Sequence, residues 1–230
     1  MNNQTEYQQY ISFIRENFPH SAYLISEEGL VKKLFACIHN SLIISDIFSS
    51  IRSLNSVCTH LLADQKLIYL KTLYTLPNND DFQFYSIMRA NVENLLRILL
   101  CAFKPEITYQ EVKETSFSQL NELLDMTYLN QKYKVELSEL YSYFGSFSKN
   151  IHRISLEKNT ILFLKEMMTK TLEPKSLETK IKSLERIKNI LVYVFLDVYK
   201  VKSFSFDTPQ LSKLHSILGE VQYEKLPLFE

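Results

Sequence analysis

Glycine is scarce in this chain of 230 residues, where it occurs only 3 times, and tryptophan is absent. Glycine supplies the positive backbone angles that tight turns need, so its scarcity argues against a sheet of many short strands and favours helices. The longest unbroken apolar run, residues 190–196, is too short to cross a bilayer. We therefore expect an all-α protein without a membrane-spanning segment.

The chain also lacks an excess of charge of either sign, because 26 basic residues balance 26 acidic ones. A neutral chain has no overall electrostatic reason to bind nucleic acid, although a local basic patch is compatible with it. The three cysteines, Cys37, Cys58 and Cys101, are few and far apart, which is typical of buried thiols in a reducing compartment. Residues 1–10 are polar and do not have the pattern of a signal peptide. We expect a cytoplasmic protein.

Apolar residues recur three or four positions apart over most of the chain, which is the period of an amphipathic helix. We expect a first helix over residues 5–17. Ser26 then begins, as an N-cap, one long helix or two nearly collinear helices that reach residue 76. After a turn at residues 77–81, a further helix runs over residues 81–103.

The second half of the chain shows the same period. We expect residues 106–116 to form a loop or short helix, residues 145–159 to be irregular or only partly helical, and residues 223–230 to be loose. Further helices are expected at 117–126, 131–144, 160–171, 176–202 and 209–218, the last with Asp207 or Thr208 as its cap.

No linker, repeat or low-complexity tract divides the chain. We therefore expect one domain over residues 1–230, a helical bundle of about seven to nine helices with a long antiparallel pair near residues 40–103. Residues 1–25 would be an N-terminal extension, and residues 203–230 a short helix and tail.

A charged stripe lies beside the apolar face of the helix expected at residues 81–103. Arg89, Glu93 and Arg97 are spaced four apart, so they share one side of a helix, and Glu93 can pair with either arginine. A salt bridge on the shoulder of a bundle and a set of partly buried charges that orient a histidine or bind phosphate are equally good interpretations.

A segment rich in tyrosine, serine and phenylalanine ends at His152 and includes Lys149 and Asn150. Histidine titrates near neutral pH and can act as a general acid or base, but a surface histidine in a polar loop is the favoured interpretation. The aromatic residues could stack on bases, although burial in the bundle is favoured. They are Tyr141, Tyr143, Phe144 and Phe147.

A row of basic residues marks the helix expected at 176–202, interrupted by Glu178 and Glu185. We expect a solvated face, with an RNA-facing groove or a dimer surface as the alternative. The basic residues are Lys175, Lys180, Lys182, Arg186, Lys188, Lys200 and Lys202.

The only repeated pattern of metal-ligand type is cysteine-x-histidine, at Cys37 and His39 and again at Cys58 and His60. Residues two apart point to different sides of a helix, and the two pairs would lie about 30 Å apart on a continuous one. Zinc requires ligands that converge on one point. We expect core cysteines and no metal site.

Two short patterns together resemble HEPN-like domains, more narrowly the uncharacterised bacterial branch with a long first helical hairpin. One is an arginine followed by a glutamate a helical turn later. The other is a leucine–tyrosine pair followed by a serine and then a histidine. The resemblance spans roughly residues 30–199, and the residues that carry it are Arg89, Glu93, Leu140, Tyr141, Ser148 and His152.

The resemblance implies an all-α bundle that often dimerises. Active members of the family are metal-independent ribonucleases of toxin–antitoxin and antiphage systems, and their motif places an arginine shortly before the histidine. In this chain no residue from 145 to 151 is arginine, and the nearest cation before His152 is Lys149. That departure also fits the inactive binding or scaffold members of the family.

Two functions therefore stay open. The absent arginine favours a non-catalytic interaction module of a bacterial defence or toxin-type system, which binds a partner protein or forms a homodimer, with RNA left open as a further ligand. The alternative is an endoribonuclease in which His152 assists attack of a 2′-hydroxyl on the adjoining phosphate, while Arg89 or Lys149 stabilises the developing charge. Asn150 would position the phosphate and Glu93 would orient Arg89. Neither function requires a metal or a small-molecule cofactor.

Overall fold

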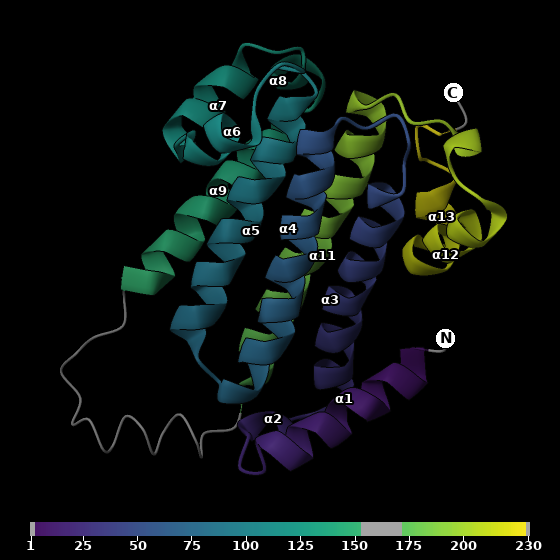
Figure 1. Ribbon diagram of the computed structural model, residues 1–230. Coiled ribbons are helices and arrows are strands. Elements are labelled where there is room, and N and C mark those ends of the chain that lie inside the picture. The colour runs from purple at the N-terminus through teal and green to yellow at the C-terminus, as the bar shows by residue number, and fades with distance from the viewer. Residues whose placement is uncertain (1–2, 153–171, 229–230) are drawn as a thin grey trace.

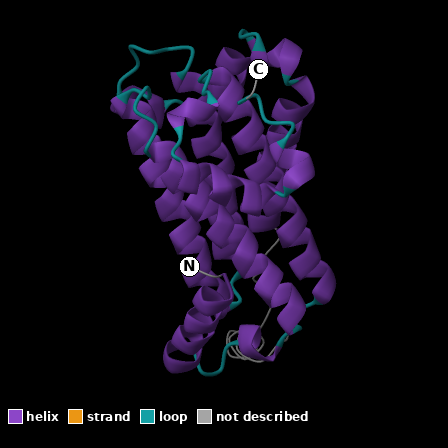
Figure 2. Ribbon diagram, turned by 90° about the vertical axis from the view of Figure 1, so that its right-hand side faces the viewer, coloured by secondary structure: helices purple, strands orange, loops and turns teal. Residues whose placement is uncertain are grey.

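Five long helices run side by side and form the body of the protein (Figure 1). The computed structural model describes residues 3–152 and 172–228, and Figure 2 shows only helices and loops in those ranges. The all-α prediction is confirmed there. The long helices are α3 (Glu28–Ser49), α4 (Ser56–Thr75), α5 (Asp81–Cys101), α9 (Lys134–His152) and α11 (Pro174–Val198).

The shorter helices close the ends and one flank of this body. The α-helices number twelve in the described residues, more than expected, because three of them are single turns of four residues. The shorter elements are α1 (Asn3–Asn17), α2 (Ala22–Ile25), η1 (Leu76–Asn78), α6 (Tyr109–Glu114), α7 (Phe117–Asp125), α8 (Leu129–Lys132), η2 (Ser203–Ser205), α12 (Thr208–Leu218) and α13 (Glu220–Tyr223).

The expectation of one long helix or two collinear helices before residue 76 is wrong. The chain reverses at residues 50–55, so α3 and α4 lie side by side as a hairpin, and α5 then packs on the other side of α4 (Figure 1). Asn55 starts α4, since its side chain accepts a hydrogen bond from the amide of Cys58 at 2.7 Å. The turn escapes notice because it contains neither glycine nor proline and its Ile51 and Leu54 keep the helical spacing.

Three smaller expectations are also corrected. Ser26 does not cap α3; Glu27 occupies that position, and the Ser26 hydroxyl donates to the carbonyl of Ala22 at 2.7 Å. Residues 145–152 are helical rather than irregular, because α9 continues to His152. The tail is not loose throughout, since Leu226 and Leu228 are buried. The helix expected at 160–171 lies outside the described residues.

The row of basic residues on α11 is not a uniformly solvated face. Lys180 and Lys188 are buried, with exposed fractions of 6% and 7%. The ammonium group of Lys180 contacts a carboxylate oxygen of Asp81 at 2.6 Å and lies 4.8 Å from the ring centroid of Phe84. Lys180 therefore ties α11 to the first turn of α5.

A buried amide network joins α4 to α5 in the middle of the bundle. The Gln65 amide nitrogen donates to the Asn91 carbonyl oxygen, and the Gln65 oxygen accepts from Asn94 at 2.8 Å. Asn94 also donates to the backbone carbonyl of Leu61 at 2.9 Å. All three amide side chains are at most 2% exposed. Because an unpaired amide is costly to bury, this network fixes the rotation of α4 about its own axis.

Helix α1 packs across one end of α3 (Figure 1). Its Tyr10 hydroxyl donates to the carbonyl of Leu73 at 2.5 Å. The imidazole of His39 stacks on the ring of Phe35 and contacts a carboxylate oxygen of Glu6 at 2.6 Å. Burial lowers the pKa of His39 below its ordinary value of 6.5; the nearby Glu6 opposes this effect and Lys213 adds to it.

This lowered pKa predicts that acid destabilises the fold through His39. Below a pH of about 6.5 the unfolded chain binds the proton more readily than the folded one, so the free energy of unfolding falls as the pH decreases through the lower folded pKa. Urea unfolding between pH 7.5 and 5.5 should show a smaller loss for His39→Phe, which keeps an aromatic stack but cannot titrate. His215→Gln, at an exposed position, should keep the wild-type pH dependence. Equal losses in His39→Phe and the wild type would contradict the assignment.

Candidate functional site

Arg97 and Glu93, two members of the charged stripe on α5, hold helix α6 in place. The guanidinium of Arg97 contacts a carboxylate oxygen of Glu93 at 2.7 Å. It also donates to the carbonyls of Val112, Lys113 and Thr115 at 2.9, 3.0 and 3.2 Å. These carbonyls lie at the C-terminal end of α6, where backbone acceptors have no partner within the helix. The stripe is thus partly the salt bridge expected on the bundle's shoulder.

Arg89 lies on an aromatic stack rather than against Glu93. Its guanidinium carbon is 4.7 Å from the ring centroid of Phe144 in α9. That ring in turn stacks on Phe117 of α7, with centroids 3.5 Å apart and planes within 5°. Arg89 is exposed and Phe144 is buried. The burial favoured for Phe144 and Phe147 is confirmed, and the charge of Arg89 stays available at the surface.

Lys149, Asn150 and His152 all lie in the last turns of α9. Helices α5 and α9 are antiparallel. Their register follows from two contacts, that of Arg89 with Phe144 and that of Tyr85 with Phe147, whose ring centroids are 5.9 Å apart. The register places Arg89 beside Phe144, which is two helical turns, about 12 Å, before His152. Lys149 is exposed and Asn150 half-buried. The side chain of His152 lies outside the described part of the structure, so the expected convergence with Arg89 stays a prediction.

These contacts predict that Arg97 matters for stability and Arg89 does not. Arg97→Lys cannot reach three carbonyls and a carboxylate together, so it should lower the free energy of unfolding by about 2 kcal/mol. Arg89→Lys in the same helix should cost less than about 0.5 kcal/mol. Urea unfolding of both variants measures the difference. Losses of equal size would contradict the role assigned to Arg97.

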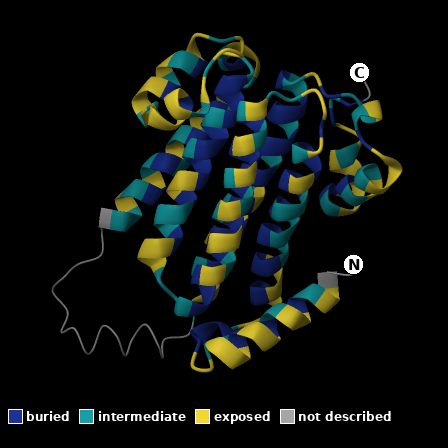
Figure 3. Cartoon of the chain, in the orientation of Figure 1, coloured by how far each residue is buried: buried dark blue, intermediate teal, exposed yellow. Residues whose placement is uncertain are grey.

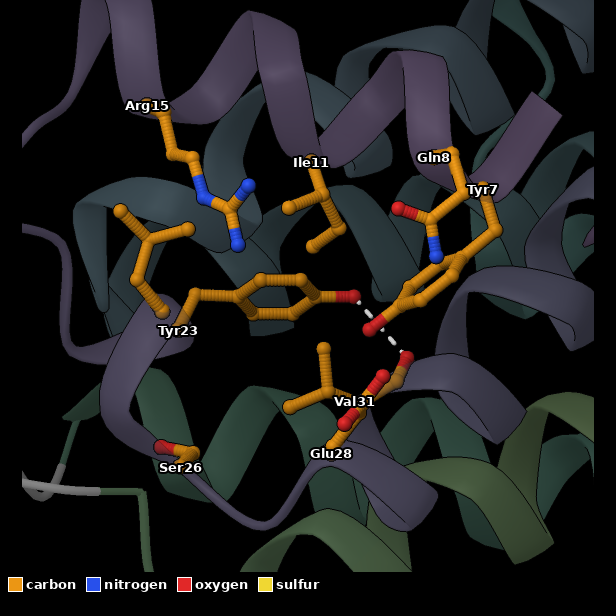
Figure 4. Close-up of a pocket in the computed structure, with 9 residues that line it drawn as sticks. Tyr7, Gln8, Ile11, Arg15, Tyr23, Ser26, Glu28 and Val31 are labelled. Carbon is orange, nitrogen blue, oxygen red and sulfur yellow. Dashed lines mark hydrogen bonds between the residues drawn. The ribbon is translucent and has the colours of Figure 1, made fainter. Parts of the chain in front are cut away.

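A small pocket of about 140 Å³ opens between α1, α2 and the start of α3 (Figure 4). Arg15 and Gln8 of α1 and Glu28 of α3 line it, over the rings of Tyr7 and Tyr23. Burial and Glu28 raise the pKa of Tyr7, and Arg15 opposes them. None of the residues expected to be catalytic lines this pocket. Arg15 and Glu28 carry opposite charges that suit a small polar molecule. Both side chains and that of Gln8 are exposed at the rim of the pocket, so the charged groups that would select a ligand are open to solvent.

The outer side of α4 carries an exposed apolar stripe, which we call the α4 stripe. Figure 3 shows exposed residues along this side, which faces outward between α3 and α5. The exposed fractions of Leu67, Leu70 and Tyr74 are 49%, 53% and 59%. The complete stripe is spaced alternately three and four residues apart and consists of His60, Ala63, Leu67, Leu70 and Tyr74.

Aromatic residues continue the α4 stripe at the Tyr74 end. The rings of Tyr74 and Phe18 form a T-shaped pair with centroids 5.9 Å apart. The rings of Phe18 and Phe13 of α1 form a second T-shaped pair with centroids 6.1 Å apart. At the other end, the imidazole of His60 contacts the ring of Tyr109 in α6, and the two ring centroids are 5.7 Å apart. Nothing in the sequence marks this surface, because apolar spacing alone does not show which side of a helix is covered.

No group of three or more histidine, cysteine, aspartate or glutamate side chains in residues 3–152 and 172–228 could hold a metal ion. Within the same ranges, no helix combines the length and the apolar character needed to cross a bilayer. No protein-family model, curated protein or solved structure matches the chain.

Proposed function

We propose that this protein is a non-catalytic interaction module that binds a partner through the α4 stripe. The observation that carries the proposal is the exposure of Leu67, Leu70 and Tyr74 on one side of a helix whose opposite side is buried. Contiguous exposed apolar surface marks interaction sites in soluble proteins. The alternating three and four spacing is the seam along which one helix packs against another.

The exposure of the stripe follows from the core and is not a local accident. Gln65 lies on the opposite side of α4, where it bonds to Asn91 and Asn94. Turning α4 to bury Leu67 and Leu70 would pull Gln65 out of this network. A side chain that must face inward therefore holds the two leucines outward.

The surroundings of the expected catalytic residues also support a non-catalytic role. Glu93 is bonded to Arg97 and is not positioned to orient Arg89 through the contacts observed. Arg89 lies against a carbon ring. The arginine motif of active HEPN-like proteins is missing before His152. A place in a bacterial defence or toxin-type system rests on the resemblance alone.

Substituting the two central leucines tests the proposal. Leu67→Lys/Leu70→Lys should weaken association at least about 100-fold, because covering each half-exposed leucine contributes about 1 kcal/mol and burying a lysine ammonium in its place costs more than that again. Met126→Lys, at a position 81% exposed on another surface, is the matched control. Light scattering after gel filtration should show a mass above 27.1 kDa for the wild type and the control, and a single chain for the double variant. Unchanged helical circular dichroism shows that the variants fold.

Two results would contradict the proposal. One is a wild-type protein that remains a single chain and retains no stoichiometric partner on purification. The other is a double variant that associates as strongly as the wild type.

Ribonuclease activity is the second candidate, favoured by the exposed cations Arg89 and Lys149 on neighbouring helices. The module proposed here should leave single-stranded and hairpin RNA intact in the presence of EDTA, as gel electrophoresis would show. Cleavage by the wild type that is lost in His152→Ala, but kept in the exposed control Lys182→Ala, would replace the module with a metal-independent ribonuclease. Retained helical circular dichroism is required of both variants.

A further inference from the structure

We infer that the α4 stripe binds the same stripe of a second copy of this chain, with the two α4 helices antiparallel about a two-fold axis between Leu67 and Leu70. This inference rests on the proposed function and names its partner. Three independent properties of the stripe carry it: the spacing of its residues, their sizes and the charges beside them.

The spacing assigns positions of a heptad seam. His60, Leu67 and Tyr74 fall at position a, and Ala63 and Leu70 at position d. In an antiparallel pair each a residue lies level with a d residue of the other helix. Leu67 of one copy therefore packs against Leu70 of the other. The two-fold axis generates a second, identical layer in which Leu70 of the first copy packs against Leu67 of the second.

The sizes of the end residues complement one another in the same register. Tyr74 lies level with Ala63 of the second copy, so the largest side chain of the stripe meets the smallest. Alternation of large and small side chains lets facing layers interdigitate without voids. A parallel pair would instead place Tyr74 against Tyr74 and Ala63 against Ala63, which crowds one end and leaves a gap at the other.

The charges beside the stripe select the antiparallel direction. Asp64 and Lys71 occupy successive e positions, and Lys66 occupies a g position. Antiparallel helices bring e against e, so Asp64 faces Lys71 of the second copy on both sides of the axis. Parallel helices bring g against e, so Lys66 would face Lys71 and repel it.

These charged groups remain able to pair across the interface. Lys71 is exposed and has no ion pair within residues 3–152 and 172–228. The Asp64 carboxylate accepts from the Tyr109 hydroxyl at 2.7 Å and from Lys113 at 3.1 Å. A carboxylate offers about four acceptor positions, so it can accept from a further ammonium group.

The aromatic ends widen the contact beyond the two helices. At each end of the pair, Tyr74 of one copy, with its neighbour Phe18, would lie about one helical turn from His60 of the other copy and from its neighbour Tyr109. A two-fold axis requires one surface to complement itself, and the α4 stripe does so in size and in charge. A foreign helix would need a separately matched sequence.

Introduced cysteines test the register. The chain's own thiols at Cys37, Cys58 and Cys101 are buried, so an exposed new thiol is the one that reacts. With an added mild oxidant, a mixture of Ala63→Cys and Tyr74→Cys proteins should form a disulfide-linked dimer on a non-reducing gel. Neither variant alone should, because its two new thiols lie about 16 Å apart in the antiparallel pair. Links within each variant alone would show a parallel pair and overturn the inference.

A charge reversal tests the direction independently. Lys71→Glu places a carboxylate beside Asp64 of the second copy, so the dimer dissociation constant measured by sedimentation should rise about 10-fold. A parallel pair would gain from the loss of the Lys66–Lys71 repulsion, and its dissociation constant would fall. Glu178→Lys, at an exposed position on α11, is the control and should change nothing.

The experiment separates this inference from the proposed function. Sedimentation of the wild type should give twice 27.1 kDa at high concentration. A wild-type chain that stays single but binds another protein, and loses it in Leu67→Lys/Leu70→Lys, overturns the second copy and keeps the interaction module. A single chain without any such partner overturns both.

Discussion

The amide network between α4 and α5 is the constraint on which the surface of this protein depends. Gln65 is fully buried, and its amide bonds to Asn91 and Asn94 of α5. Hydrophobic burial alone would leave the rotation of α4 undecided, because apolar side chains surround this helix on all sides. The cost of an unpaired buried amide decides it, and the α4 stripe is the apolar face that remains outside.

Charged side chains serve the packing of this bundle more than its chemistry. Arg97 holds the end of α6 through three carbonyls, and the Arg186 guanidinium contacts Glu139 of α9 at 2.6 Å. Lys180 reaches Asp81 from inside the core. Each joins two different helices. A charged residue in an apolar helix can therefore connect two helices and need not be a reactive group.

The sequence predicted those elements whose ends carry their own chemical signals. The turn before α5 has Pro77 and a left-handed Asn79, and α12 begins at the capping box of Asp207, as expected. The reversal between α3 and α4 was missed because Asn55 is its one local signal. At the candidate site, spacing allowed Glu93 to pair with either arginine, and it pairs with Arg97. The other partners of Arg97 come from α6, and the ring under Arg89 comes from α9. Spacing also cannot tell a core stripe from an outer one, so it does not predict the exposure of Leu67 and Leu70.

The energetics of the α4 stripe suit a reversible contact. Covering a leucine that is half exposed contributes about 1 kcal/mol, so four leucines and two tyrosines together contribute about 6 kcal/mol. Association costs at least about 4 kcal/mol in lost translational and rotational freedom. The stripe alone would thus be marginal, and the aromatic ends with Phe18 and the pairs of Asp64 with Lys71 decide whether the dimer is populated. A contact so balanced depends on concentration and salt, because part of its strength is the attraction between exposed charges. The proposed dimer would therefore form and separate without any change of fold.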